Sequence, residues 1–316
     1  MSVKYPIVAV SGSSGAGTTT VRQAFQDIFR REGLSAAFVE GDAFLRYGRD
    51  EMNAFIARTF KEGRMVSHFG PEANLLSELE ALFREYAEHG TGKIRHYVTE
   101  DTGDRFGRAP GTFTPWEPLP TGTDLLFYEG LHGGVVARTW TRRQMSPSHN
   151  PWVIERRRRD GDGGVDVAQY VDLLIGVAPV VNLEWIQKIH RDTRIKGHTP
   201  EAVTDTILRR LRDYIHFIVP QFTISDINFQ RVPVVDTSNP FIARDVPSAD
   251  ESVVVIRFRE PQKFHFPNLL KRLHGSFMSR PNTMVVPGGK MQMALEVICT
   301  PLIHELCEKR RHEEAS

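Results

Sequence analysis

The chain has 316 residues, of which 40% are hydrophobic and 25% charged, with a formal net charge of +1. This composition indicates a globular protein that is long enough for one large domain or two small ones. The near-zero net charge disfavours a nucleic-acid-binding protein, because such proteins carry a basic surface. No charged leader precedes the first apolar segment and no apolar run reaches membrane-spanning length, so we expect a cytoplasmic protein without membrane contact.

Short apolar strands alternate with amphipathic helices from the start of the chain. Continuous apolar runs predict parallel strands at 7–10, 36–40, 125–129 and 173–177. Helices are expected after the first strand, from about 71 to 88 before Gly90, and from 182 to 196 before Gly197. This alternation predicts an α/β fold whose ligand lies at the carboxyl ends of the strands.

The C-terminal part continues with a helix that Thr199 caps and Pro200 starts, a strand at 252–258 and a mostly helical tail. Cys299 and Cys307 are expected on one helix of that tail, about 12 Å apart. This separation is too long for a disulfide and agrees with a reducing compartment.

Residues 139–164 break the pattern, because arginine, proline and glycine gather there. The segment is interpreted as an exposed insertion, and the run at 156–159 as solvated arginines. No internal repeat is present in the sequence, so residues 1–316 are expected to form one domain.

The stretch "IVAVSGSSGAGTTTV" at 7–21 has the outline of a phosphate-binding loop between a strand and a helix. Its glycines allow backbone N–H groups to point inward, and the helix adds its positive end. Thr18 stands where such loops usually carry lysine, and the alternative is a glycine-rich turn without ligand. The context favours ATP binding, by Gly12, Ser13, Ser14, Gly15, Ala16, Gly17, Thr18, Thr19 and Thr20.

One hydroxyl and two acids are candidates for magnesium binding and proton transfer. Thr19 is placed to offer its hydroxyl to Mg²⁺. Glu129 ends a buried strand, where phosphate-loop enzymes place the carboxylate that orients magnesium. Asp42 follows the second strand, so it can serve as a base at the same sheet edge or simply cap a turn.

The helix at 182–197 carries Glu184, Lys188, Arg191 and Asp192 on one side. They form either a ladder of exposed ion pairs or an element that brings cations to the nucleotide phosphates. The missing lysine of the loop makes the second interpretation more attractive.

Arginines outside this helix are candidates for a phosphorylated substrate, because guanidinium binds phosphate with two parallel hydrogen bonds. The candidates are Arg49, Arg209 and Arg210. The twelve histidines show no metal-binding spacing.

The chain is similar to the bacterial phosphoribulokinases of the phosphoribulokinase and uridine kinase family of phosphate-loop kinases. The matching blocks span nearly the whole chain: "GSSGAGTTT", "EGDAF", "LLFYEGLHG", "VNLEWIQKIHRD", "NFQRVPVVDTSNPFIA" and "DESVVVIRFR". The resemblance implies a mixed, mostly parallel sheet flanked by helices. It also implies transfer of the ATP γ-phosphoryl group to the 1-hydroxyl of ribulose 5-phosphate, with Mg²⁺.

The resemblance assigns roles by position. It implies that Asp42 is the catalytic base, Glu129 the magnesium-orienting acid and Asp192 a second catalytic or metal carboxylate. It places Lys188 and Arg191 at the transferred phosphate. It places Arg49 and Lys196 at the sugar phosphate.

Regulation and assembly are implied by the resemblance alone. Arg31, Arg257 and Arg280 match positions linked to activation by NADH in bacterial members. Those members are commonly octameric, so we expect a homo-oligomer, either an octamer or a smaller symmetric form.

Two positions depart from the family pattern at the acceptor side. Leu45 replaces a histidine and Lys196 replaces an arginine, and lysine offers a point charge instead of a bidentate contact. Two alternatives therefore stay open: the same transfer to another sugar phosphate or a nucleoside, and a non-catalytic protein that senses nucleotides.

Overall fold

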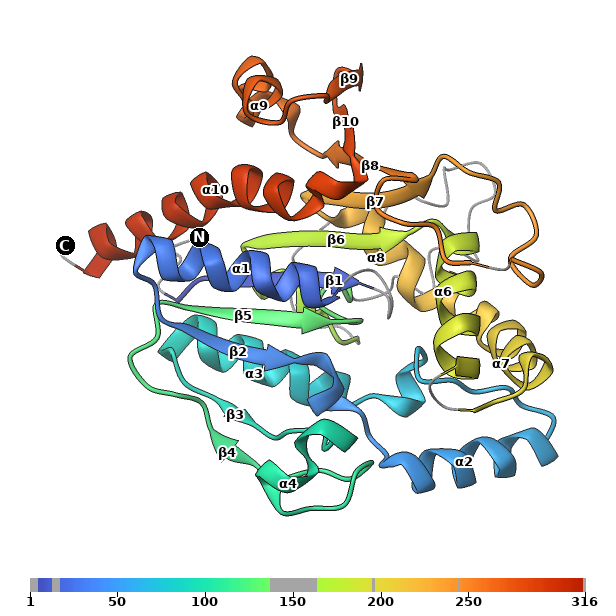
Figure 1. The fold of residues 1–316 in the computed structure, drawn as a ribbon. Helices are drawn as coiled ribbons and strands as arrows, with labels where there is room; N and C mark the ends of the chain where they lie inside the picture. The colour runs from blue at the N-terminus through green and yellow to red at the C-terminus, as the bar shows by residue number, and fades with distance from the viewer. Residues whose placement is uncertain (1–4, 13–17, 137–163, 195–196, 244, 315–316) are drawn as a thin grey trace.

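The computed structural model contains one eight-stranded mixed sheet with helices on both faces (Figure 1). The structure describes residues 5–12, 18–136, 164–194, 197–243 and 245–314. The strand order is β2-β5-β1-β6-β7-β8-β10-β9. The bounds are β1 Ile7–Gly12, β2 Ala36–Glu40, β5 Leu125–Gly130, β6 Leu173–Pro179, β7 Ile227–Pro233, β8 Ser252–Phe258, β9 Phe277–Arg280 and β10 Thr283–Pro287.

Parallel and antiparallel pairing divide this sheet into two parts. Strands β2, β5, β1, β6 and β7 pair in parallel, and β8, β10 and β9 continue the sheet in antiparallel pairs. All seven residues of β6 are buried, as expected for a continuous apolar strand that is covered on both faces. The predicted mixed, mostly parallel sheet is confirmed.

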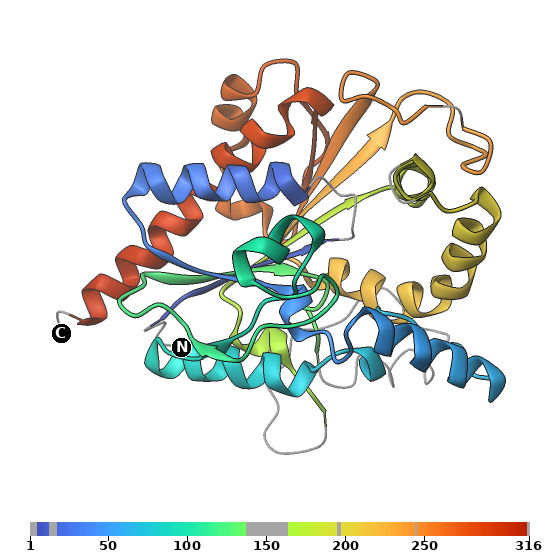
Figure 2. The same cartoon turned by 60° about the horizontal axis from the view of Figure 1, so that its bottom comes forward.

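Two apolar cores lie on the two faces of the sheet. Side chains alternate along a strand, so Val8 and Val10 of β1 join one core while Ile7 and Ala9 join the other. The first core packs under α1 (Thr18–Glu32) and α10 (Met291–Glu314), and the second against α3 (Leu76–His89). Figure 2 shows α1 and α10 on one side of the sheet and α3 on the other.

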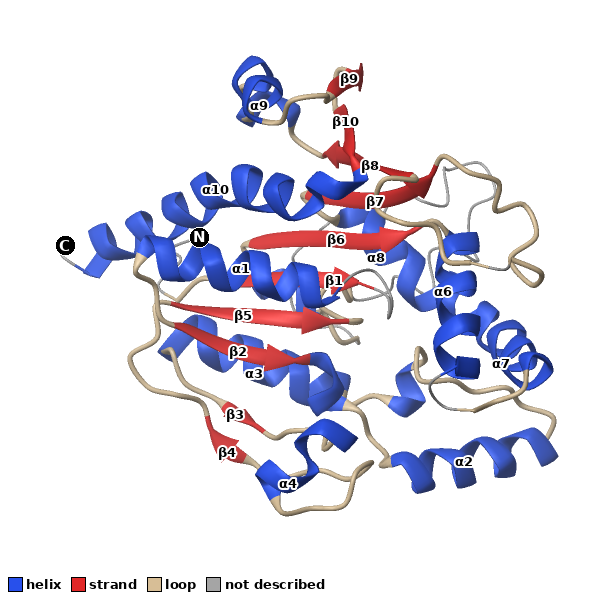
Figure 3. Cartoon of the chain, in the orientation of Figure 1, coloured by secondary structure: helices blue, strands red, loops and turns tan. Residues whose placement is uncertain are grey.

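A group of helices stands beyond the carboxyl ends of the parallel strands, at the right of Figure 3. The group comprises α2 (Arg49–Lys61), α6 (Val181–Arg194) and α7 (Pro200–Asp213). A π-helical turn, Tyr214–Ile218, joins α7 to α8 (Val219–Ile224), which returns to the sheet. The remaining short elements are β3 (Lys93–Ile94), β4 (Glu117–Pro118), α4 (Gly103–Phe106) and α9 (Phe266–Arg272).

Most predicted boundaries are confirmed to within two residues. Both β2 and β8 have the predicted bounds. Gly90 and Gly197 adopt left-handed φ angles of 67° and 68°, which glycine favours at the end of a helix. The Thr199 side chain caps α7 by accepting a hydrogen bond from the backbone N–H of Ala202.

The helix predicted from about 71 to 88 begins later than expected. Pro71 starts only a short 3₁₀ turn, Pro71–Ala73, and α3 begins at Leu76. Asn74 separates the two elements because its backbone is extended. Its side-chain Nδ2 donates to the carbonyl of Gly70 at 2.7 Å. The prediction of the helix start was therefore wrong by about one turn.

Near the C-terminus, the hairpin of β9 and β10 and the helix α9 were not predicted. The predicted helical tail is α10, which carries both cysteines in buried positions. The predicted insertion lies outside the described residues from 139 to 163. Among the described residues, no helix is long and apolar enough to cross a membrane.

Candidate active site

The carboxyl ends of β1, β2 and β5 meet at one edge of the sheet (Figure 1). Glu129 of β5 lies opposite Val10 of β1 and opposite Glu40 of β2. A 3₁₀ turn, Gly41–Phe44, follows β2 directly and holds Asp42 at the same edge. The fold therefore brings the predicted base and the predicted magnesium-orienting acid together.

The phosphate loop has the predicted place between β1 and α1. Gly12 ends β1, and a Cβ at this position would lie 2.8 Å from the carbonyl oxygen of Val177, so only glycine fits. Residues 13–17 lie outside the described residues, and α1 begins directly after them, at Thr18. The ATP-binding roles of residues 12–20 and the magnesium role of Thr19 stay predictions.

Two cavities open at this edge of the sheet. The smaller, of about 330 Å³, lies beside the phosphate loop and is lined by Gly12, Arg22, Glu40 and Glu129 among others. The larger, of about 550 Å³, lies between the sheet edge and helices α2, α6 and α7. Asp42 lines both cavities, so its carboxylate stands where their contents meet.

The smaller cavity is acidic. Asp42 faces the open cavities, yet the protein that surrounds it, together with the nearby Glu40, raises the pKa of its carboxyl. Burial raises the pKa of Glu129 to about 7; Arg22 acts to lower this pKa, and Glu40 and Asp42 act to raise it. Arg22 is held by Glu40, with 2.6 Å between Nη1 and Oε1. Three carboxyl groups thus share one small space.

These residues fit a hard divalent cation. Carboxylate and hydroxyl oxygens are the ligands that Mg²⁺ prefers, and it is commonly held by one or two protein carboxylates together with substrate phosphates. The mutual repulsion of Glu129, Glu40 and Asp42 is relieved when a cation binds among them. Among the described residues, no cluster of three metal-ligating side chains is present, so a cation here would need ligands in addition to these carboxylates.

Helix α6 places its charged residues at the larger cavity, which Lys188, Arg191 and Asp192 all line. Asp192 is buried and accepts from both cations, at 2.5 Å from Lys188 Nζ and 3.1 Å from Arg191 Nε. Burial lowers the pKa of Lys188, although Asp192 opposes this effect. Lys188 and Arg191 thus form ion pairs with Asp192, but these pairs line a cavity and Asp192 is only 5% exposed.

Arg209 and Arg210 of α7 face the same cavity. Their Nε atoms are buried and have no hydrogen-bond partner among the described residues. Burial lowers the pKa of Arg210, and the neighbouring Arg209 lowers it further. Together with Lys188 and Arg191, which pair with Asp192, they give the larger cavity a basic wall, which suits an anionic ligand.

Two other predicted substrate residues are not brought into this wall. Arg49 forms a bidentate pair with Glu100, at 2.8 and 3.0 Å, and does not line the larger cavity. This pair raises the pKa of the Arg49 guanidinium. Lys196 lies outside the described residues.

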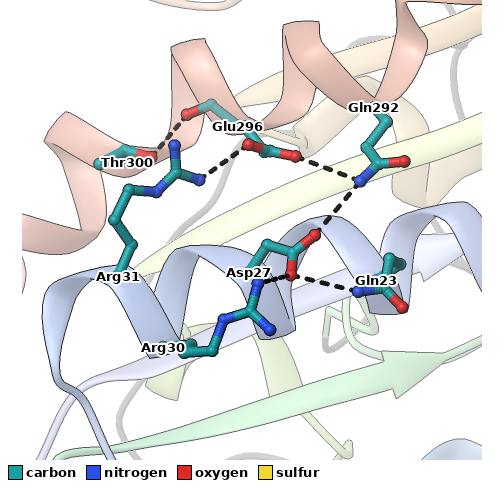
Figure 4. A network of polar contacts seen from close by, with 7 residues as sticks. All are labelled: Gln23, Asp27, Arg30, Arg31, Gln292, Glu296 and Thr300. Atoms are coloured by element: carbon teal, nitrogen blue, oxygen red, sulfur yellow. Dashed lines mark hydrogen bonds and ion pairs between the residues drawn. The ribbon is translucent and has the colours of Figure 1, made fainter.

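The predicted effector residues lie away from both cavities. Arg31 of α1 pairs with Glu296 of α10 at 2.7 Å, within the polar contacts that join the two helices in Figure 4. Arg257 of β8 and Arg280 of β9 are exposed and both lie opposite Thr283 of the intervening β10.

Leu45 lines the larger cavity, where the family pattern has a histidine. It lies at the end of the turn that carries Asp42, and its backbone N–H donates to the Asp42 carbonyl at 3.2 Å. Arg95 holds the Leu45 carbonyl at 2.5 Å and stacks on the ring of Phe113. The substituted side chain therefore sits in a fixed turn beside the predicted base.

Sequence reasoning missed several residues that line the cavities. Arg22 and Glu40 form the pair beside the phosphate loop, and Leu131 lines both cavities. Glu40 could have been found, since it ends the strand that leads into Asp42. His68 and Tyr97, on loops around the larger cavity, carry no sequence signal.

Comparison with known proteins gives concordant results. Residues 7–238 match the profile of the Phosphoribulokinase / Uridine kinase family. The chain is 54% identical to the chromosomal phosphoribulokinase of Cupriavidus necator over 98% of this chain and 99% of that protein. It is 52% identical to a probable phosphoribulokinase of Escherichia coli, covering 99% and 100%. A solved phosphoribulokinase from Rhodobacter spheroides, 51% identical, superposes with a TM-score of 0.84 over 98% of this chain and all of that one.

Proposed function

We propose that the chain phosphorylates the 1-hydroxyl of ribulose 5-phosphate with ATP, because it belongs to the phosphoribulokinase and uridine kinase family. The product is ribulose 1,5-bisphosphate, as the family resemblance implies. The observation that carries the proposal is the position of Asp42, which lines both the cavity beside the phosphate loop and the basic cavity next to it.

Asp42 acts as the general base in this reaction. A kinase must bring a nucleotide and an acceptor together from two sides, and Asp42 faces both. Its carboxylate takes the proton of the acceptor hydroxyl as that oxygen attacks the γ-phosphorus. Its surroundings raise the pKa of the Asp42 carboxyl, which brings its basicity closer to what proton abstraction near neutral pH requires.

Cations of α6 offset the negative charge of the transferred phosphate in place of the lysine that the loop lacks. Thr18 replaces the usual lysine of the loop, and Lys188 and Arg191 line the cavity on the acceptor side of Asp42. In the structure Asp192 holds both cations in place, so their positions are fixed before the phosphates arrive. Such preorganised charge is usually the largest single contribution to phosphoryl transfer.

Thr19 and Glu129 would hold magnesium beside the loop. Magnesium held there would offset the negative charge of the nucleotide phosphates. Glu129 must be ionised for this role, and its pKa of about 7 makes the role sensitive to pH in the neutral range.

Arg209 and Arg210 bind the 5-phosphate of the acceptor. Both are held at the basic wall by α7, and guanidinium groups bind phosphate through charge-assisted hydrogen bonds. Arg49 and Lys196 remain proposed contacts of the sugar phosphate. Arg49 must release its ion pair with Glu100 to bind that phosphate.

The protein is further proposed to be a cytoplasmic homo-oligomer, an octamer or a smaller symmetric form, that NADH activates through Arg31, Arg257 and Arg280. Anion binding at Arg31 must compete with Glu296. Arg31→Gln is expected to leave turnover without NADH unchanged and to reduce the response to NADH. Turnover with and without NADH, together with light scattering, measures both properties.

Assay of the purified protein with magnesium and ATP tests the main proposal. ADP release is followed with ribulose 5-phosphate, other pentose phosphates and nucleosides. Ribulose 5-phosphate is expected to give the highest kcat/KM. Preference for another acceptor would contradict the proposal, and absence of turnover on all acceptors would point to a sensor; the named relatives favour neither alternative.

A further inference from the structure

We propose that His68 is a further acceptor-binding residue, whose imidazole hydrogen-bonds an uncharged oxygen of the sugar. The inference rests on the proposed function, because it needs a sugar phosphate in the larger cavity. His68 lies on the loop between α2 and α3 and lines that cavity together with Lys188, Arg209 and Arg210.

The backbone around His68 is held from both sides. Asn74, which is 3% exposed, donates from Nδ2 to the His68 carbonyl at 2.8 Å. Ser67 donates to Asp213 of α7 at 2.8 Å, and the ring of Phe69 meets that of Tyr214 at 5.6 Å. His68 is therefore fixed between a loop and α7, as expected for a residue that positions a ligand.

The two ring nitrogens of His68 have different surroundings. Nδ1 is buried and has no hydrogen-bond partner among the described residues. Nε2 is not among these buried atoms without a partner, and the His68 side chain lines the larger cavity. Nε2 is therefore the nitrogen that a ligand in the cavity reaches.

The charge around His68 determines what this nitrogen recognises. Burial lowers the pKa of His68 to about 4, and Arg210, Lys188 and Arg209 add to this effect. The imidazole is therefore neutral at pH 7, while the surrounding cations supply the attraction for phosphate. The arginines and the lysine can bind the charged phosphate. The neutral imidazole nitrogen is suited to an uncharged hydroxyl or keto oxygen of the sugar.

Substitution of His68 by glutamine, asparagine and alanine tests the proposal. A glutamine amide can replace Nε2, whereas an asparagine amide reaches only the position of Nδ1. We expect His68→Ala to raise the KM for ribulose 5-phosphate about 10-fold, the loss of one neutral hydrogen bond, with an unchanged KM for ATP. His68→Gln is expected to stay within about threefold of the wild type, and His68→Asn to resemble alanine.

Controls separate this role from a structural one. His216→Ala is the matched variant, because His216 is exposed on the π-helical turn after α7 and does not line the cavity. Thermal unfolding is measured for all variants, and if alanine destabilises the fold, the difference between glutamine and asparagine decides. An unchanged KM for the acceptor in His68→Ala, or equal impairment by glutamine and asparagine, would overturn the role of His68. Absence of turnover by the wild type would instead overturn the proposed function, and the role with it.

Discussion

The two cavities that meet at Asp42 carry opposite charge. The smaller holds Glu40, Asp42 and Glu129 beside the phosphate loop, and the larger holds Lys188, Arg209 and Arg210. Asp192 pairs with Lys188 in the larger cavity and Arg22 pairs with Glu40 in the smaller one, which leaves Arg209 and Arg210 to attract an anion and Asp42 and Glu129 to attract a cation. In the proposed function, this contrast separates the ligands: magnesium with nucleotide phosphates on one side, and a phosphorylated acceptor on the other.

Substitution of Asp42, which both cavities share, should stop the reaction between their ligands. Asp42→Asn keeps the size of the side chain but cannot accept the proton, so kcat is expected to fall by roughly 10² to 10⁴ or more. ATP affinity should be retained, because the phosphate loop is untouched. Steady-state turnover and nucleotide titration measure the two effects.

Asp205→Asn is the matched control, since Asp205 is exposed on α7 and lines neither cavity. It should behave as the wild type. Turnover of Asp42→Asn at the rate of this control would contradict the assignment of the base.

The cations of α6 should be more important for rate than for acceptor binding. Lys188→Met removes a charge from the cavity that Asp42 also lines, and kcat is expected to fall by about 10² to 10³. The KM for ATP should change little. Rate measurements at saturating substrates separate kcat from KM, and Lys271→Met, an exposed variant on α9, is the control. An unchanged kcat would show that the charge comes from elsewhere.

The arginines of α7 should affect mainly acceptor binding. Arg210→Ala is expected to raise the KM for ribulose 5-phosphate about 10- to 100-fold, the value of one charge-assisted hydrogen bond, without changing the KM for ATP. Initial rates at varied acceptor concentration measure this, with Arg212→Ala, exposed on the same helix, as control. Equal effects on both KM values would remove the distinction between the cavities.

Burial and repulsion of the carboxylates in the smaller cavity should make the free energy of unfolding depend on pH. The pKa of Glu129 is raised from 4.5 to about 7, so the folded state binds its proton more tightly than the unfolded chain does. The wild type therefore loses stability as pH rises from about 4.5 to about 7. Without magnesium, Glu129→Gln should be more stable at pH 8 by roughly 1 to 2 kcal/mol, since solvent screens part of the shift.

The gain in Glu129→Gln should vanish well below pH 4.5, where the wild-type carboxyl is protonated in both the folded and the unfolded state. Chemical denaturation at several pH values measures it. Glu85→Gln, on the exposed side of α3, is the control. A gain that is independent of pH would mean that burial and repulsion do not act on Glu129.

How far the sequence predicts this molecule depends on the kind of residue. The strand Ala36–Glu40 was predicted to the residue because its apolar run is unbroken up to Glu40, although β2 is an edge strand in which buried and half-buried residues alternate. The edge strand Phe277–Arg280 was missed, since three of its four residues are exposed and it has no such pattern. The start of α3 was misplaced because Pro71 begins a 3₁₀ turn as readily as an α-helix.

The candidate site divides in the same way. Asp42 and Glu129 follow buried strands, so the topology of a parallel sheet alone brings them to one edge. The arginines carry no such signal: Arg209 and Arg210 line the cavity, whereas Arg49 pairs with Glu100. Which arginine reaches a ligand depends on tertiary packing, and local sequence does not determine that.

The position of Asp42 between two separate ligands is the central claim, and a crystal structure of Asp42→Asn with a non-hydrolysable ATP analogue, magnesium and ribulose 5-phosphate tests it most directly. The nucleotide phosphates are expected in the smaller cavity and the sugar phosphate in the larger, with the 1-hydroxyl about 3 Å from the side chain of residue 42. A 1-hydroxyl beyond hydrogen-bonding reach of residue 42, or both ligands in one cavity, would contradict the claim.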